Sequence, residues 1–213
     1  MKLKNLILSI LAGTFLVSCN TEKSVQTQDL RSVEGISQLE QEHTLEKESY
    51  ADSVNAGLVE DTFKGSARRE AKGSIGNADI IVNYGSPGKR GRVIWNGLVS
   101  YDQVWVSGSH WATAIDFSED VMIGDTEVTA GMYGFFTIPG REEWTLILNK
   151  VYDQHLADDY EEEEDVVRIT VTPEELEEEV QRLTYTVETE SGNHGYISLS
   201  WDKVKVSLPV RGK

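Results

Sequence analysis

The fold is predicted most directly by residues 111–140, which read WATAIDFSEDVMIGDTEVTAGMYGFFTIPG. Over residues 111–117 the side chains alternate in size and polarity, which is the period of a strand with one buried face. Two short apolar runs flank Gly124-Asp125 in the pattern of a tight hairpin. Pro139-Gly140 then ends a further strand. Strands and turns spaced this closely leave no room for a long helix.

The same alternation recurs on both sides of this stretch, from residue 73 to the C-terminus. Further strands are expected over 80–84, 144–148, 166–171, 183–187, 196–201 and 204–208, the last two joined by a turn at Asp202-Lys203. The pattern predicts an all-β fold, an antiparallel β-sandwich or a partly open barrel of about 8–10 strands. Thr172-Pro173, followed by acids, is typical of a helix start. A short helix or an irregular connection is therefore expected over 173–182.

The N-terminus has the features of an export signal. Lys2 and Lys4 precede a mostly apolar run over 6–17, which has the length of a signal-peptide core rather than of a membrane span. Leu16-Val17-Ser18-Cys19 resembles the bacterial lipobox, and Cys19 is the single cysteine of the chain. That resemblance implies cleavage before Cys19 and attachment of lipid to it. We therefore expect a lipid-anchored protein of the cell envelope, at the outer membrane on its periplasmic side or at the surface. An ordinary secretory signal is the alternative.

Residues 19–72 are rich in Glu, Gln, Ser and Thr and contain only scattered aliphatic side chains. A segment of this kind buries too little apolar surface to offset the entropy lost on ordering, so we predict a flexible tether. A structured helix that binds a partner is the alternative. The predicted organisation is a signal peptide over 1–18, the lipidated tether over 19–72 and the β domain over 73–213.

The chain is strongly acidic, with 36 Asp and Glu against 20 Lys and Arg and a formal net charge of -16. This charge argues against nucleic acid as a partner, because phosphate backbones are bound by basic patches. The acids concentrate in residues 153–179, where a solvated, self-repelling segment is the expected role. They lack the ligand spacing of a calcium loop, so no metal site is expected. Neither a Walker loop nor a dinucleotide fingerprint occurs, so no cofactor is expected.

Short motifs follow one another in a fixed order between Tyr84 and Trp144. They are Tyr84-Gly85-Ser86-Pro87, Gly91-Arg92, Gly97-Leu98-Val99, Trp105-Val106-Ser107-Gly108, Ala112-Thr113, Ala130-Gly131-Met132-Tyr133, Phe136-Thr137-Ile138-Pro139 and Glu143-Trp144. This order resembles the bacterial domain-of-unknown-function family 2911 (DUF2911) and extends over residues 72–210. The resemblance implies an exported, often lipid-anchored β-rich domain with no established activity. The chain departs from the family where Val106, His110 and Trp111 replace its usual Arg, Asn and Glu.

His110 and Trp111 are the candidate binding residues. They follow the flexible Ser107-Gly108-Ser109, and an aromatic ring beside an imidazole offers a stacking face next to a polar group. A glycan, a peptide or another envelope protein is the expected partner, besides the membrane reached through the lipid anchor. Trp111 also alternates with Ile115 and Phe117 along a strand, so a position in the core is the alternative for it.

Catalytic signatures such as G-x-S-x-G or H-E-x-x-H do not occur in the sequence. Ser191-Gly192-Asn193-His194 has the composition of a hairpin turn. Catalytic groups also converge from distant positions, and His110, His155 and a carboxylate are the residues that would do so here. We therefore expect a non-catalytic binding module of the envelope, with no catalytic residues. A hydrolase built on His110, His155 and carboxylates is the alternative.

Overall fold

The computed structural model describes residues 49–213. The signal peptide, Cys19 and residues 20–48 of the predicted tether lie outside the described residues. Among those described, the strands are β1 (Ala67–Ile75), β2 (Ala78–Ser86), β3 (Thr113–Phe117), β4 (Val121–Ile123), β5 (Thr126–Val128), β6 (Gly131–Ile138), β7 (Trp144–Asn149), β8 (Asp165–Val171), β9 (Glu174–Ser191) and β10 (His194–Gly212). Residues 49–55 form a helix and Glu162–Glu164 a single 3-10 turn.

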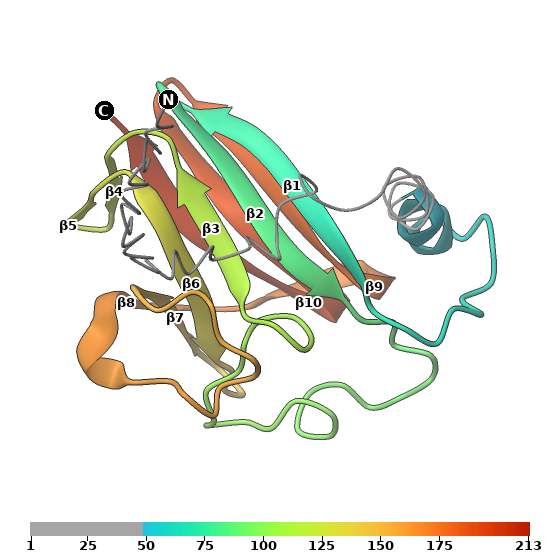
Figure 1. Ribbon diagram of the computed structural model, residues 1–213. Helices are drawn as coiled ribbons and strands as arrows, with labels where there is room; N and C mark the ends of the chain where they lie inside the picture. The colour runs from blue at the N-terminus through green and yellow to red at the C-terminus, as the bar shows by residue number, and fades with distance from the viewer. Residues whose placement is uncertain (1–48) are drawn as a thin grey trace, which may run out of the picture.

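The strands form two open antiparallel sheets that pack face to face (Figure 1). One sheet has the order β1-β2-β3-β6-β7-β8 and the other the order β5-β4-β10-β9. Alternate side chains of both sheets are buried between them, among them Ile80 and Leu146 on one side and Leu199 and Trp201 on the other. This arrangement confirms the predicted all-β sandwich, because period-two alternation supplies each sheet with one apolar face. No helix among residues 49–213 is long and apolar enough to cross a membrane.

The last two predicted strands are confirmed as the two arms of β10, which lie side by side in the four-stranded sheet. The hydroxyls of Ser198 and Ser207 are 2.9 Å apart, and the backbone N–H of Gly212 donates to the carbonyl of Asn193 over 2.8 Å. A straight strand of this length would place its ends about 60 Å apart, so the chain reverses between the two arms. Asp202 adopts a left-handed φ of 55°, as the turn predicted at Asp202-Lys203 requires. The pairing register with β9 shifts on either side of this turn.

The helix or irregular connection expected over 173–182 is wrong, because β9 begins at Glu174. Pro173 lies just before the strand, where its missing N–H costs no ladder hydrogen bond. Many of the acids over 174–179 are exposed, and Glu174 lies 3.8 Å from Lys205 on β10. Pairing with β10 therefore overrides the local helix signal. The residues of β10 that pair here lie far along the chain, so no local sequence pattern reveals this pairing.

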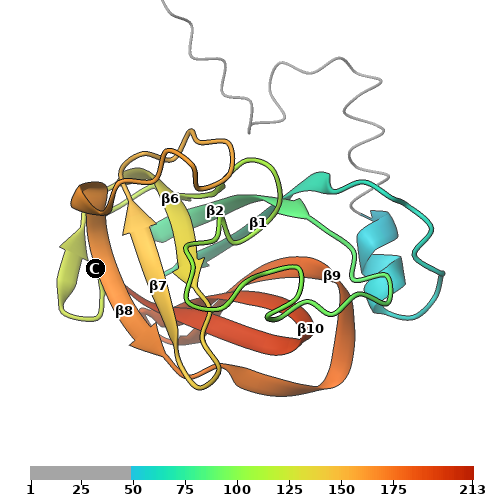
Figure 2. The same cartoon turned by 90° about the horizontal axis from the view of Figure 1, so that it is seen from below.

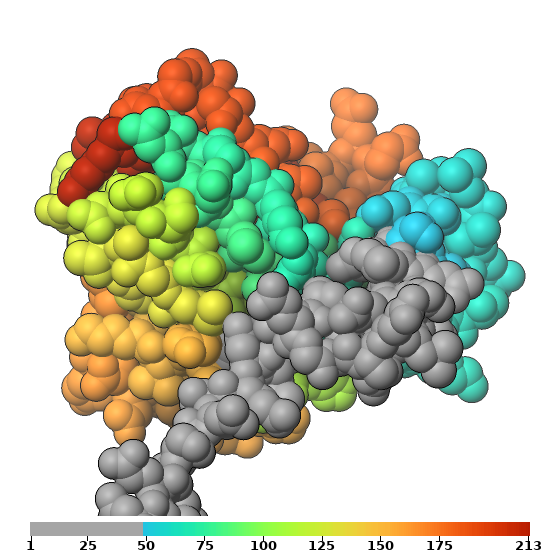
Figure 3. Space-filling model, turned by 45° about the horizontal axis from the view of Figure 1, so that its top comes forward, coloured from blue at the N-terminus to red at the C-terminus, as the bar shows by residue number. Residues whose placement is uncertain are grey.

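The folded domain begins before residue 73. β1 starts at Ala67, and Ala51 and Val54 of the 49–55 helix are buried, although the helix and the first part of β1 fall within the range predicted as tether. Asn55 Nδ2 donates to the carbonyl of Arg182 over 3.0 Å, and Asn55 Oδ1 accepts from its backbone N–H over 2.7 Å. Figure 3 shows residues 49–66, in blue to cyan, at one side of the domain next to β1. Polar contacts to distant residues therefore hold this segment on the domain.

Candidate functional site

The connection between β2 and β3, residues 87–112, runs across one end of the sandwich (Figure 2). Its residues with a left-handed φ are Arg90, Asn96, Asp102, Ser107 and His110, besides Gly91. A backbone bridge between Trp105 and Thr137 of β6 ties its middle to the six-stranded sheet, with N–H to carbonyl distances of 2.8 and 3.0 Å. The connection is therefore a shaped structure rather than a loose loop.

A pocket of about 430 Å³ opens between this connection and the segment that leads into β1. We call it the loop pocket. Its lining combines aromatic side chains (Trp105 and Trp201), basic ones (Lys64, Arg90, Arg92 and His110), small polar ones (Ser66 and Ser109) and apolar ones that include Leu98 and Leu156. Its volume lies in the range of pockets that hold small molecules.

The aromatic part of the pocket is rigid. Trp105 and Trp201 are stacked, with ring centroids 6.2 Å apart and an interplanar angle of 22°. Trp105 Nε1 donates to the carbonyl of Gly108 over 3.1 Å, which fixes the orientation of its ring. Trp95 packs edge-on against both rings and against Trp144. Half-buried Trp105 is thus held from behind by the core and faces the pocket from a fixed position.

Two buried polar atoms of the lining residues have no hydrogen-bond partner among residues 49–213. They are Nε1 of Trp201, whose side chain is 1% exposed, and Oγ of Ser109. A buried polar group without a partner costs about 1–3 kcal/mol, so such groups are rare in folded proteins. Both belong to residues of the pocket wall, which makes them candidates for hydrogen bonds to a ligand.

The charge of the lining is opposite to that of the molecule. Lys64, Arg90, Arg92 and His110 line the pocket, and no Asp or Glu is among its described lining residues. Burial lowers the pKa of Arg92, as does the nearby positive charge of Arg90, while Asp61 raises it. The guanidinium stays protonated at neutral pH, so the two arginines repel one another beside the pocket.

Lys89, next to Arg90 in the chain, is satisfied within the protein. Its Nζ lies 2.7 Å from Asp202 and also pairs with Glu179. Burial works to lower the pKa of Lys89, but hydrogen bonds to Asp202 and Glu179 raise it above its usual value. Neither acid lines the pocket, so the compensation given to Lys89 does not extend to Arg90.

Of the two residues predicted to bind a ligand, His110 lines the loop pocket and Trp111 does not. Trp111 is half-buried and precedes β3. Its ring meets that of His155 edge-on at 5.4 Å, and the backbones of these two residues form an isolated bridge. The His110 and His155 rings lie 6.4 Å apart, but His155 is not among the lining residues. Of the three candidates from the sequence, His110 therefore lines the loop pocket, while Trp111 and His155 lie outside it.

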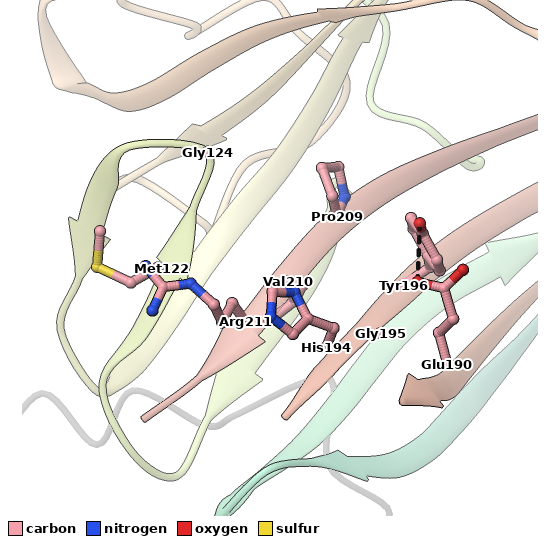
Figure 4. A pocket seen from close by; sticks show the side chains of 9 residues that line it. All are labelled: Met122, Gly124, Glu190, His194, Gly195, Tyr196, Pro209, Val210 and Arg211. Atoms are coloured by element: carbon pink, nitrogen blue, oxygen red, sulfur yellow. Dashed lines mark hydrogen bonds between the residues drawn. The ribbon is translucent and has the colours of Figure 1, made fainter. Parts of the chain in front are cut away.

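A second hollow, of about 180 Å³, lies at the opposite end of the sandwich (Figures 1 and 4). Met122 of β4 and Arg211 of β10 lie side by side there, as their strand register requires. Glu190 accepts a hydrogen bond from the hydroxyl of Tyr196 over 3.3 Å. The β9–β10 turn next to it has Gly192 at a φ of 57°, which confirms the hairpin turn predicted for Ser191-Gly192-Asn193-His194. The smaller volume and the presence of both charge signs make this hollow the weaker candidate.

Metal binding has no support among residues 49–213, where no group of three or more His, Cys, Asp or Glu side chains could hold an ion. The motifs that surround the loop pocket, from Tyr84-Gly85 to Trp105 and on to Trp144, are those that resemble a known family. The profile of that family, described as a protein of unknown function (DUF2911), matches residues 66–210.

The chain belongs to the DUF2911 family. The matched range contains strands β1 to β9 in full, all of β10 except Arg211 and Gly212, and the whole 87–112 connection. No curated protein and no solved structure matches the chain. The function of this DUF2911 domain is therefore argued from the loop pocket itself.

Proposed function

We propose that this DUF2911 protein is a lipid-anchored protein of the cell envelope whose β-sandwich binds a ligand in the loop pocket without transforming it. The observation that carries the binding role is the pairing of a fixed aromatic wall with Nε1 of Trp201 and Oγ of Ser109, which have no hydrogen-bond partner among residues 49–213. Binding sites combine apolar or aromatic walls with a few placed polar groups in this way. The envelope location is supported by the lipobox at Cys19.

Binding is favoured over hydrolysis by the surroundings of the pocket hydroxyls. A nucleophilic serine needs a base within hydrogen-bond reach, yet Oγ of Ser109 has no partner among the described residues. The alternative site of His110, His155 and a carboxylate has little support, since only His110 lines the pocket. A hydrolase would have to complete its catalytic group from elsewhere.

The envelope location is tested by Cys19→Ala. This variant should appear in the soluble fraction or keep its uncleaved signal, because a membrane holds a protein stably only through two or more acyl chains. Fractionation and the intact mass of the purified protein give the answer. Ser18→Ala is the matched control, because it keeps a small residue before Cys19 and should remain lipidated. Identical partitioning of wild type and Cys19→Ala, without an acyl group on Cys19, contradicts the anchor.

The binding role is tested by purifying the intact lipoprotein from its own membranes and identifying bound species by native mass spectrometry. Trp201→Phe should retain about tenfold less ligand, because it removes a donor whose loss costs about 1–3 kcal/mol. Trp95→Phe is the matched control. Nε1 of Trp95 is also buried without a partner among the described residues, but Trp95 does not line the pocket. Equal retention by the two variants, or no bound species in the wild type, would refute the binding role.

A further inference from the structure

The basic side chains of the loop pocket differ from most other cations of the domain. Paired cations include Arg69 with Asp52, Arg182 with Asp61, Arg168 with Asp165 and Lys213 with Asp120. Lys64 and Arg90 have no ion-pair or hydrogen-bond partner among residues 49–213, although acids outnumber bases in the whole chain by 36 to 20. Lys64 and Arg90, together with Arg92, therefore create a positive potential at the loop pocket of an otherwise acidic molecule.

The guanidinium of Arg92 is held in a fixed orientation within this positive region. Its Nε donates to the carbonyl of Lys89 over 3.1 Å, and its Nη2 donates to the carbonyl of Gly88. Two hydrogen bonds to backbone carbonyls hold the guanidinium in place before any ligand arrives. A preorganised planar fork is suited to an oxyanion, with which it forms short, charge-assisted hydrogen bonds.

The rest of the lining fits a ring that bears hydroxyl groups. Trp105 presents a half-buried indole next to the basic residues, and an aromatic surface of this kind packs against the C–H face of a sugar. Nε1 of Trp201 and Oγ of Ser109 lack partners among the described residues, and hydroxyl groups would supply them. A bare inorganic anion would leave the aromatic wall unused, and a neutral sugar would leave the cations uncompensated.

We propose that the ligand of the loop pocket is an anionic saccharide, a sugar ring that carries a phosphate or a carboxylate group. The inference rests on the binding function proposed above. The oxyanion lies between Arg90, Arg92 and Lys64, and the ring lies on Trp105. His110, the sequence candidate that the structure places in the pocket, lies at this site as well.

The test measures the affinity of the full-length lipoprotein in detergent for four probes by isothermal titration calorimetry. Glucose 6-phosphate and glucuronate represent the two anionic groups, glucose the neutral ring, and inorganic phosphate the anion without a ring. Either or both of the anionic sugars should bind at least about tenfold more tightly than glucose and than phosphate, with an affinity that falls as salt is added. The tighter of the two tells a phosphate site from a carboxylate site.

Arg90→Gln removes one unpaired pocket cation and should weaken binding of the tighter sugar at least about tenfold. Lys150→Gln is the matched control, because Lys150 is an exposed cation outside the pocket. The Lys150→Gln variant should bind the sugar with the affinity of the wild type. Equal binding of glucose and the anionic sugars, no binding of either anionic sugar, or an unchanged affinity in Arg90→Gln overturns the proposal. If a neutral species is bound in the native membranes and Trp201→Phe loses it, the binding function stands while the anionic ligand is refuted.

Discussion

Replacing Asp61 with Asn should lower the free energy of unfolding by about 3–5 kcal/mol, the range for removing one partner of a buried ion pair. The side chains of Arg182 and Asp61 are only 1% and 6% exposed. Nε and Nη2 of Arg182 donate to the same carboxylate oxygen over 3.0 and 2.7 Å. Without the negative charge, the guanidinium is left buried and uncompensated, and urea denaturation measures the loss.

Glu127→Gln is the control for this prediction. Glu127 pairs with Lys213, and the two side chains are 56% and 48% exposed. Because water screens an exposed ion pair, its removal should cost no more than about 1 kcal/mol. Equal losses in the two variants would show that the buried pair contributes no more than a surface pair.

The Asp61 variant should also have a local effect. The Arg182 guanidinium lies over the rings of Tyr50 and Phe63, at 5.5 and 5.1 Å from their centroids, and donates to the carbonyl of Gly65 over 3.2 Å. Residues 49–66 are therefore attached to β9 at Arg182, through its guanidinium and through the two hydrogen bonds between Asn55 and its backbone. In Asp61→Asn, limited proteolysis should cut within this segment before the sandwich unfolds. Ligand affinity should fall too, because Lys64 and Ser66 line the loop pocket.

Trp144→Ala should destabilise the domain by about 3–5 kcal/mol, the usual cost of truncating a buried aromatic residue. Trp144 is 2% exposed on β7, and its ring packs edge-on against Trp95 with centroids 4.8 Å apart. Removing it leaves a cavity between the two sheets that their backbones cannot close. The loss is measured by the same denaturation experiment.

Trp111→Ala provides the comparison and tests the assignment of that residue. Trp111 is half-buried outside β3 and its ring contacts His155 at the surface, so its truncation should cost roughly 1 kcal/mol. Binding to the loop pocket should stay unchanged, because Trp111 is not among the lining residues. A loss as large as that of Trp144→Ala would place Trp111 in the core. A loss of binding without a loss of stability would restore it as a binding residue.

The candidate site could be predicted only in part. His110 was found because it departs from the family pattern within a recognisable motif, and it does line the pocket. Lys64 fell in the range assigned to the tether. Arg90 and Arg92 could have been identified from the sequence as candidate binding residues, because two arginines in a short loop are unusual in so acidic a chain. Trp201 ends a predicted strand, and its place in the pocket wall depends on the path of the 87–112 connection.

The all-β sandwich follows from the sequence alone, because burial of one sheet face gives strands such as β1 a period-two alternation that is visible locally. The exact strand boundaries do not follow from it. The local helix signal at Pro173 was overridden by the pairing of β9 with β10. The loop pocket and the Asp61–Arg182 pair were decided only by the tertiary structure. That pair joins residues separated by 121 positions, and the pocket joins residues 64, 90, 105 and 201. Their proximity depends on how the two sheets stack, a relation that no stretch of consecutive residues contains.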